Sequence, residues 1–399
     1  MTRRTPADAV TLPDVAPVAE VATILRHRLV TPVFQPIVDL ATGAVVAAEA
    51  LARGPAGTRL ERPDELFAAA NEAGQLGPVD MLCAERALEC ALGTADPPPM
   101  LFINAEPAVL DQPLSPRMLE LLLSGPPFRI VLEYTERALS TVPGALLRIA
   151  GHAHRLGNAI ALDDVGADPM SLAFLPFIEP DVIKLDMHLL RRPSAPATAQ
   201  VAAVVAATAR RTGATVIAEG IETAADIDVA LRLGATWGQG WHFGRPGPIT
   251  ALGRAPVGRT PAVRAARPGL HQPVGSPFEV AVATRGSAGL AGDATVGAAL
   301  ERISAAVGGQ EHAVVLGSYC VPGDVEQWLP RIERVTRQAV YTAVLGPDCG
   351  RQPFPGESSL VVSTPGYAAA LCRRPGAGVL FTEDHETVAA VGRVLLQRL

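Results

Sequence analysis

The sequence predicts an α/β protein in which a (β/α) barrel is followed by a smaller second α/β unit. Short apolar runs alternate with amphipathic stretches over about 240 residues, which is the cadence of buried parallel strands joined by helices. The chain of 399 residues is longer than one ordinary domain. Its 48% hydrophobic and 19% charged content indicates a well-packed globular protein.

The first part of the chain predicts an entry helix and a β-hairpin. Residues 1–13 are predicted to be a loose tail, and apolar spacing predicts a helix over Val15–Leu29. Two β-rich runs, Val33–Leu40 and Ala44–Leu51, are joined by a short turn that contains Gly43, which is a hairpin signal. Helical patterns follow at Pro63–Ala73 and Val79–Leu92.

Strands and helices then alternate. The predicted buried strands are Met100–Asn104, Arg129–Tyr134, Ala159–Leu162, Val182–Leu185, Thr215–Ala218 and Thr236–Gln239. The predicted helices between them are Pro116–Leu123, Val142–Leu156, Ala197–Arg211 and Ala224–Leu233. We therefore place the barrel domain at residues 14–247.

Residues 248–277 are predicted to be a linker. From Arg245 to Pro277, arginines stand among many Pro and Gly residues and no acidic residue is present, which indicates a solvated connection. The alternative is that this basic segment touches a phosphate or a partner surface.

Residues 278–399 are predicted to be a second α/β domain. Its predicted strands are Glu279–Ala283, His312–Leu316, Tyr341–Leu345, Ser359–Ser363 and Gly378–Thr382, and its helices are Ala294–Val307, Val325–Ala339 and Glu386–Leu399. Asp293 and Asp384 are predicted N-caps of the first and last helices. The unit has no Gly-rich phosphate loop and no dense acidic cluster, so we interpret it as a sensory or interaction domain.

The composition limits which partners the protein can attract and indicates its cellular compartment. A formal charge of -6 gives no general attraction to nucleic-acid polymers or anionic membranes, so an anionic ligand must be held locally. Five cysteines without a C-x-x-C pair fit a reducing cytoplasm. We see no signal peptide and no apolar run of membrane-spanning length, and we expect a cytoplasmic protein.

Polar residues end the predicted strands. The ends carry Asn104, Glu133, Asp163-Asp164, Lys184, Glu219 and Gln239, and the second hairpin arm ends in Glu49-Ala50-Leu51-Ala52-Arg53. In a (β/α) barrel these ends meet at one mouth. Crowded carboxylates lose their charge unless cations neutralise them, and oxygen ligands without His or Cys favour Mg²⁺ or Mn²⁺. Two such ions roughly 3.5–4 Å apart suit the attack of water on a phosphodiester.

Lys184 is the only lysine, since the other 33 of the 34 Lys+Arg positions are arginine. An ammonium is a compact point charge, whereas guanidinium is a wide planar fork. Lys184 would orient the attacking water, and Glu219 would take its proton. Taken singly, these residues have structural alternatives. Lys184 could be a chance lysine, Asn104 could form a turn, and Asp163-Asp164 before Gly166 could be a plain turn. Glu133 and Glu136 could be ordinary carboxylates at the start of a helix near Thr135.

Several motifs together resemble one family. They are Phe34-Gln35-Pro36-Ile37, Glu49-Ala50-Leu51, Asn104, Glu133-Tyr134-Thr135-Glu136, Asp163-Asp164-Val165-Gly166, Ile183-Lys184-Leu185-Asp186, Ala218-Glu219-Gly220-Ile221-Glu222 and Gly238-Gln239-Gly240. In this order, over roughly residues 18–247, they resemble the EAL-domain family. The resemblance implies a modified TIM barrel with one antiparallel strand, and hydrolysis of cyclic di-GMP to linear pGpG with Mg²⁺ or Mn²⁺.

The resemblance also implies roles for individual residues. It implies metal ligation, of two ions, by Glu49, Asn104, Glu133, Asp163 and Asp164. It implies that Lys184 and Glu219 act at the catalytic water with Gln239 beside them, and that Gln35, Arg53 and Gln239 hold substrate. Glu136, Asp186 and Glu222 would contact these groups and hold them in position. A homodimer through the barrel is also expected.

One departure from the family keeps two functions open. Family members usually continue Phe-Gly-Thr-Gly-Tyr-Ser-Ser after the paired aspartates, in a loop linked to metal binding, dimer contacts and activity. Here the chain reads Val165-Gly166-Ala167-Asp168-Pro169-Met170-Ser171, and Gly54 follows the arginine. We therefore weigh a phosphodiesterase regulated by residues 278–399 against a non-hydrolytic cyclic di-GMP receptor. A different Mg²⁺ enzyme on the same barrel is a third alternative.

The second domain resembles the DICT sensory domain. The resemblance rests on Ala313–Leu316, Thr342–Leu345 and Val379–Thr382 before a closing helix. Its signal or protein partner is not predicted. Cys320, Cys349 and Cys372 are either redox-responsive or buried structural thiols.

Overall fold

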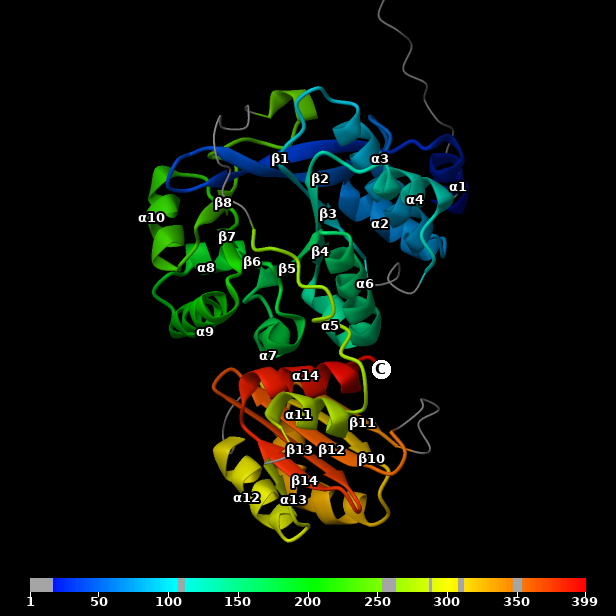
Figure 1. Ribbon diagram of the computed structural model, residues 1–399. Coiled ribbons are helices and arrows are strands. Elements are labelled where there is room, and N and C mark those ends of the chain that lie inside the picture. Colours follow the sequence, from blue (N-terminus) through cyan, green and yellow to red (C-terminus); the bar gives the residue numbers. More distant parts are fainter. Residues whose placement is uncertain (1–16, 107–111, 253–262, 287–288, 308–311, 347–353) are drawn as a thin grey trace, which may run out of the picture.

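The structure is a computed structural model that describes residues 17–106, 112–252, 263–286, 289–307, 312–346 and 354–399. It contains a closed barrel of strands β1–β8 and a six-stranded sheet in the order β11-β10-β12-β13-β14-β9 (Figure 1). The predicted barrel and the second α/β unit are both confirmed.

The barrel contains one antiparallel strand. β1 (Thr31–Asp39) runs antiparallel to both of its neighbours, β2 (Val45–Arg53) and β8 (Trp237–Gln239), whereas the remaining neighbours pair in parallel. The hairpin turn depends on Gly43, whose φ of 70° suits a residue without Cβ. The other strands are β3 (Met100–Asn104), β4 (Arg129–Tyr134), β5 (Ala159–Val165), β6 (Val182–Leu185) and β7 (Thr215–Ala218).

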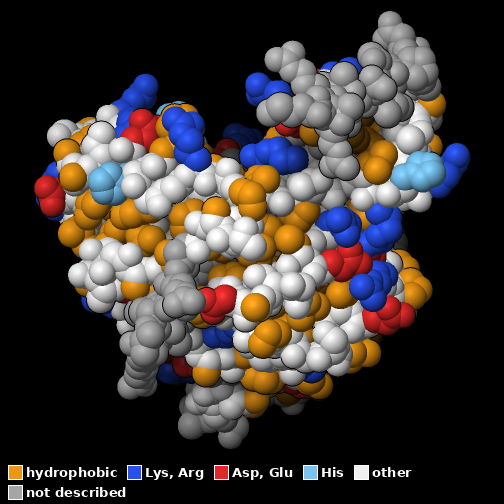
Figure 2. Space-filling view, turned by 90° about the horizontal axis from the view of Figure 1, so that it is seen from above, with side chains coloured by type: hydrophobic (Ala, Val, Ile, Leu, Met, Phe, Trp, Pro, Cys, Tyr) orange, Lys and Arg blue, Asp and Glu red, His pale blue; other side chains and the backbone are white. Residues whose placement is uncertain are grey.

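Helices surround the barrel, as Figure 1 shows. They are α1 (Pro17–His27), α2 (Pro63–Glu72), α3 (Leu76–Leu92), α4 (Pro116–Leu123), α5 (Glu136–Thr141), α6 (Pro143–Arg155), α7 (Pro169–Ile178), α8 (Met187–Arg191), α9 (Pro196–Thr212) and α10 (Ala224–Arg232). Among the described residues, no helix is both long and apolar enough to cross a membrane. Figure 2 shows Lys and Arg side chains interspersed with acidic and apolar ones on the face seen from above.

The prediction of a solvated linker is wrong for residues 263–276, while residues 253–262 lie outside the described part. Val263 joins the buried cluster inside the barrel. The guanidinium of Arg264 is 11% exposed and donates to Asp181 Oδ1 at 2.6 Å and to the Thr212 carbonyl at 2.7 Å. Buried His271 donates from Nε2 to the Ile178 carbonyl at 2.6 Å. The acidic residues that neutralise this segment lie in distant parts of the chain, so the composition of the segment alone did not indicate that it is packed.

The second domain places helices on both faces of its sheet. Its strands are β9 (Leu290–Ala291), β10 (Val314–Tyr319), β11 (Tyr341–Leu345), β12 (Ser358–Thr364), β13 (Tyr367–Arg374) and β14 (Gly378–Thr382). Its helices are α11 (Pro277–Arg285), α12 (Thr295–Val307), α13 (Asp324–Gln338) and α14 (His385–Leu396). In Figure 1, α11 and α14 lie between the sheet and the barrel, while α12 and α13 cover the other face.

Two predictions for this domain are wrong. The expected strand Glu279–Ala283 is part of helix α11, because Ser276 and Glu279 form a capping box and Pro277 occupies the first turn. Asp293 binds Arg373 at 2.9 Å instead of capping α12. Asp384 does cap α14, since its carboxylate accepts from the Thr387 amide at 3.0 Å.

Candidate active site

The ammonium of Lys184 lies at the centre of a carboxylate cluster. Lys184 belongs to β6 and is 1% exposed. Its Nζ lies 2.7 Å from Glu133 Oε1 and 2.7 Å from Glu219 Oε1. It also lies 3.1 Å from Asp163 Oδ1 and 3.6 Å from Glu49 Oε2. Since the contributing strands belong to one closed barrel, their carboxyl ends bring these side chains together at one mouth.

A bulge in β5 aims the paired aspartates. Leu162 pairs with Ile183 and Val165 pairs with Leu185, so β5 has one extra residue here. Asp164 takes a left-handed conformation with φ of 53°. In a regular strand, Asp163 and Asp164 would face opposite sides of the sheet. With the bulge, carboxylate oxygens of both residues and of Glu219 lie within 4.8 Å of one another.

Two side-chain amides fix the orientation of Glu49. Asn104 Nδ2 donates to Glu49 Oε1 at 3.0 Å, and Gln239 Nε2 donates to Glu49 Oε2 at 2.6 Å. Gln239 also donates to Gln35 Oε1 at 3.1 Å, and Gln35 Nε2 donates to the Gly244 carbonyl at 3.2 Å. The antiparallel hairpin makes this possible, because its register places Gln35 directly opposite Glu49.

Burial and mutual repulsion raise most carboxyl pKa values in the cluster. Burial is the largest cause of the raised pKa of Glu133, and Glu49 and Asp163 add to it against the opposing effect of Lys184. Burial, despite the opposing Lys184, and repulsion by Asp163 and Glu49 raise the pKa of Glu219 to about 8. Burial and Asp163 raise that of Asp164 to about 6.

Glu49 and Lys184 are held in their charged forms. Burial favours neutral Glu49, but Lys184 and the two amide donors outweigh it and lower the pKa of Glu49. Burial likewise opposes the charge on Lys184, yet the surrounding carboxylates raise its pKa well above the usual value. The cluster therefore holds more acidic groups than one cation can neutralise.

Some predicted site residues lie apart from the cluster. Arg53 donates to the Ala52 carbonyl at 2.7 Å and lines a pocket of about 180 Å³ together with Asn104. The Asp186 carboxylate caps α8, accepting from the His188 amide at 2.7 Å. Exposed Glu222 pairs with Arg191 at 3.0 Å. The Glu136 side chain lies outside the described part of the structure.

Asp80 is a pocket residue that the sequence did not reveal. It lies on α3, lines the same pocket as Arg53 and is 5% exposed. Its Oδ2 accepts from the Glu106 amide at 3.3 Å, and burial raises the pKa of Asp80 to about 7. The available signal was one acid within the apolar face of a predicted helix, between Val79 and Leu82.

The family model for the EAL domain matches residues 19–246. The chain belongs to the EAL-domain family. Probable cyclic di-GMP phosphodiesterase PdeB of Escherichia coli (strain K12) is 30% identical over 229 residues, which are 55% of this chain and 43% of PdeB. Uncharacterized protein Rv1357c of Mycobacterium tuberculosis (strain ATCC 25618 / H37Rv) is 29% identical over 233 residues, or 54% of this chain and 75% of that protein. The chain thus spans less than half the length of PdeB.

Solved EAL structures have the same barrel. The Xanthomonas citri FimX EAL domain in complex with c-diGMP has a TM-score of 0.52 and 17% identity, over 60% of this chain and 96% of that chain. The PaMucR phosphodiesterase, c-di-GMP complex has a TM-score of 0.51 and 23% identity, over 59% of this chain and 98% of that chain. The EAL-domain match ends before the second domain, so its resemblance to the DICT domain stays a prediction.

Proposed function

We propose that the chain hydrolyses cyclic di-GMP to linear pGpG with Mg²⁺ or Mn²⁺. The observation that carries the proposal is the convergence of Glu49, Glu133, Asp163 and Glu219 on Lys184, with Asp164 beside them. Membership in the EAL-domain family supports it, as does the similarity to PdeB.

The donor set fits divalent cations. It offers carboxylate and amide oxygens, and buried Glu133 Oε2 has no hydrogen-bond partner. Four carboxylates also share a single ammonium, and a fifth acid, Asp164, lies beside them. Glu49, Asn104, Glu133, Asp163 and Asp164 would hold the ions, and the adjacent aspartates would serve two of them. Bound ions would activate water and neutralise the phosphodiester charge.

The protein's own residues supply positioning and proton transfer. Glu219 is the base that takes the proton of the attacking water, and nearby cations would favour its ionised form. Lys184 holds Glu219 at 2.7 Å and presents a positive charge to the reaction centre. Gln35, Gln239 and Arg53 provide donors for the substrate, and the Arg53 fork suits a phosphate.

Product analysis tests this proposal. The purified chain with Mn²⁺ should convert cyclic di-GMP to linear pGpG, as followed by chromatography. Glu49→Gln should lose this conversion, because it removes a ligand charge while keeping the shape. The matched control Glu301→Gln changes an exposed helix residue in the second domain and should retain the parental rate. Equal rates in both variants would contradict the assignment of Glu49.

A non-hydrolytic cyclic di-GMP receptor is the second candidate. The loop after Asp164 supports it, because Pro169 occupies the first turn of α7 and Asp168 caps that helix. A loop fixed in this way could hold ligand without assisting turnover. Tight binding of cyclic di-GMP by the parent chain without pGpG formation would identify the receptor. The homodimer through the barrel, regulation by residues 278–399 and the cytoplasmic location remain proposals.

A further inference from the structure

Helix α7 begins directly behind the paired aspartates. The Ala167 amide donates to the Asp164 carbonyl at 3.1 Å. The Gly166 amide donates to Ser171 Oγ at 3.2 Å, which ties the first turn of α7 to the chain next to Asp164. The Asp168 carboxylate caps α7 by accepting from the Met170 amide at 2.7 Å. These hydrogen bonds connect the start of α7 to the backbone of Asp164.

The other end of α7 is held by the second domain. Arg393 of α14 is 2% exposed and donates to the Phe177 carbonyl at 2.7 Å and to the Pro176 carbonyl at 3.2 Å. It also pairs with Glu179 at 3.3 Å, the residue that ends α7 in a left-handed conformation with φ of 41°. Donation to the last carbonyls of a helix is a specific C-terminal anchor.

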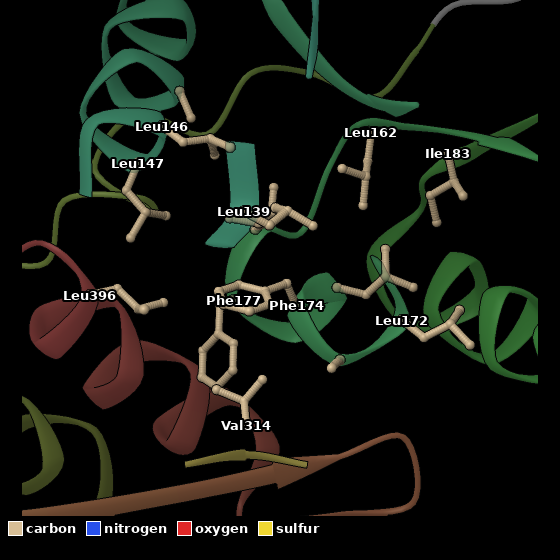
Figure 3. Close-up of a cluster of buried hydrophobic side chains, with 14 of the residues drawn as sticks. Leu139, Leu146, Leu147, Leu162, Leu172, Phe174, Phe177, Ile183, Val314 and Leu396 are labelled. Atoms are coloured by element: carbon tan, nitrogen blue, oxygen red, sulfur yellow. The ribbon is translucent and has the colours of Figure 1, made fainter. Parts of the chain in front are cut away.

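Apolar packing fixes the same contact. Figure 3 shows Phe174 and Phe177 of α7 beside Leu396 and Val314 of the second domain, all within one buried cluster. The Phe174 and Tyr341 rings meet edge to face at 5.1 Å between centroids. Gly392 lies against the Phe177 ring so closely that a Cβ there would be 2.2 Å from a ring carbon.

We propose that the second domain holds α7 in place for the metal-binding aspartates, with Gly392 and Arg393 as positioning residues. The left-handed conformation of Asp164 persists only where its surroundings determine it, and α7 is the element that follows it. The inference rests on the proposed function. It assigns a fixed structural contribution to a domain that lies outside the EAL match.

Gly392→Ala tests the inference in the whole chain. The added methyl group should displace α7, while the hydrogen-bonding side chains at this contact, including Arg393, are left unaltered. We expect Mn²⁺ affinity, measured by calorimetric titration of the metal-free protein, to fall about three- to thirty-fold. Turnover at subsaturating Mn²⁺ should fall with it and recover at saturation. The control Gly292→Ala adds the same methyl group where no atom lies within 4 Å and should keep the parental affinity.

A second substitution provides rescue. Phe177→Leu removes the ring carbon Cε1, which the new Cβ would approach to 2.2 Å, and gives the shorter side chain room to turn away. Mn²⁺ affinity should therefore be higher in Phe177→Leu/Gly392→Ala than in Gly392→Ala alone. If Gly392→Ala does not fold, Arg393→Lys decides, because it keeps the charge opposite Glu179 but loses the forked donation. Parental Mn²⁺ affinity in the folded variants would overturn the inference. A parent chain that binds neither Mn²⁺ nor cyclic di-GMP would instead refute the proposed function.

Discussion

Replacing Lys184 by methionine should destabilise the metal-free barrel severely. Two carboxylate oxygens lie 2.7 Å from the ammonium, and two unit charges at that distance attract by about 6 kcal/mol at an effective dielectric constant of 20. Desolvation of the buried ions offsets part of this attraction. Removing one partner of a buried pair usually costs about 3–5 kcal/mol, which is the loss we expect in the free energy of unfolding.

The assay is urea unfolding of the parent and Lys184→Met in EDTA at pH 8 and pH 5. The loss should be smaller at pH 5, because Glu219 and Asp164, with pKa values of about 8 and about 6, then take up protons. Arg302→Met removes an exposed cation paired with Glu383 and should leave stability nearly unchanged. A loss for Lys184→Met below about 1 kcal/mol at both pH values would refute the reasoning.

Three further predictions follow from the same contacts. In EDTA, the parent should become less stable as pH rises from about 5 to 8, because Asp164 and Glu219 have raised pKa values and must lose protons in the folded state. Urea titrations across this pH range measure the free energy of unfolding, and a rise in that free energy with pH would contradict the prediction. Arg264→Ala should cost about 3–5 kcal/mol in thermal or urea unfolding, since it leaves buried Asp181 without its closest cation; unchanged stability would mean that His154 suffices. Asp168→Ala should cost about 1 kcal/mol through loss of the α7 cap, and hydrogen exchange at Met170 should rise with it; an unaltered exchange rate would argue against the cap.

Most strands of the barrel were predictable because they are short buried runs with a polar residue at or next to the carboxyl end. Met100–Asn104 and Val182–Leu185 match the observed bounds. Helix α7 was not predicted, because it is buried against the barrel on one side and the second domain on the other. Apolar residues occupy nearly every face of this helix, so its hydrophobic pattern shows no 3.6-residue period.

The site was predictable as a set of residues, but its geometry was not. Neighbouring strand ends indicated which carboxylates would converge. The β5 bulge that turns both Asp163 and Asp164 to one side depends on pairing with β6, which no local pattern encodes. The packed segment after Val263 was missed for a similar reason. Its arginines Arg264 and Arg267 pair with Asp181 and Glu179, which are distant in the sequence.

The most direct test of the account is cyclic di-GMP turnover by the purified chain with saturating Mn²⁺, compared with Lys184→Arg. Linear pGpG from the parent, with a rate about 10²–10⁴-fold lower for Lys184→Arg, is the predicted result, because the guanidinium fork does not fit where four carboxylates surround a compact ammonium. Equal turnover by both proteins, or no turnover by a parent that binds cyclic di-GMP, would contradict it.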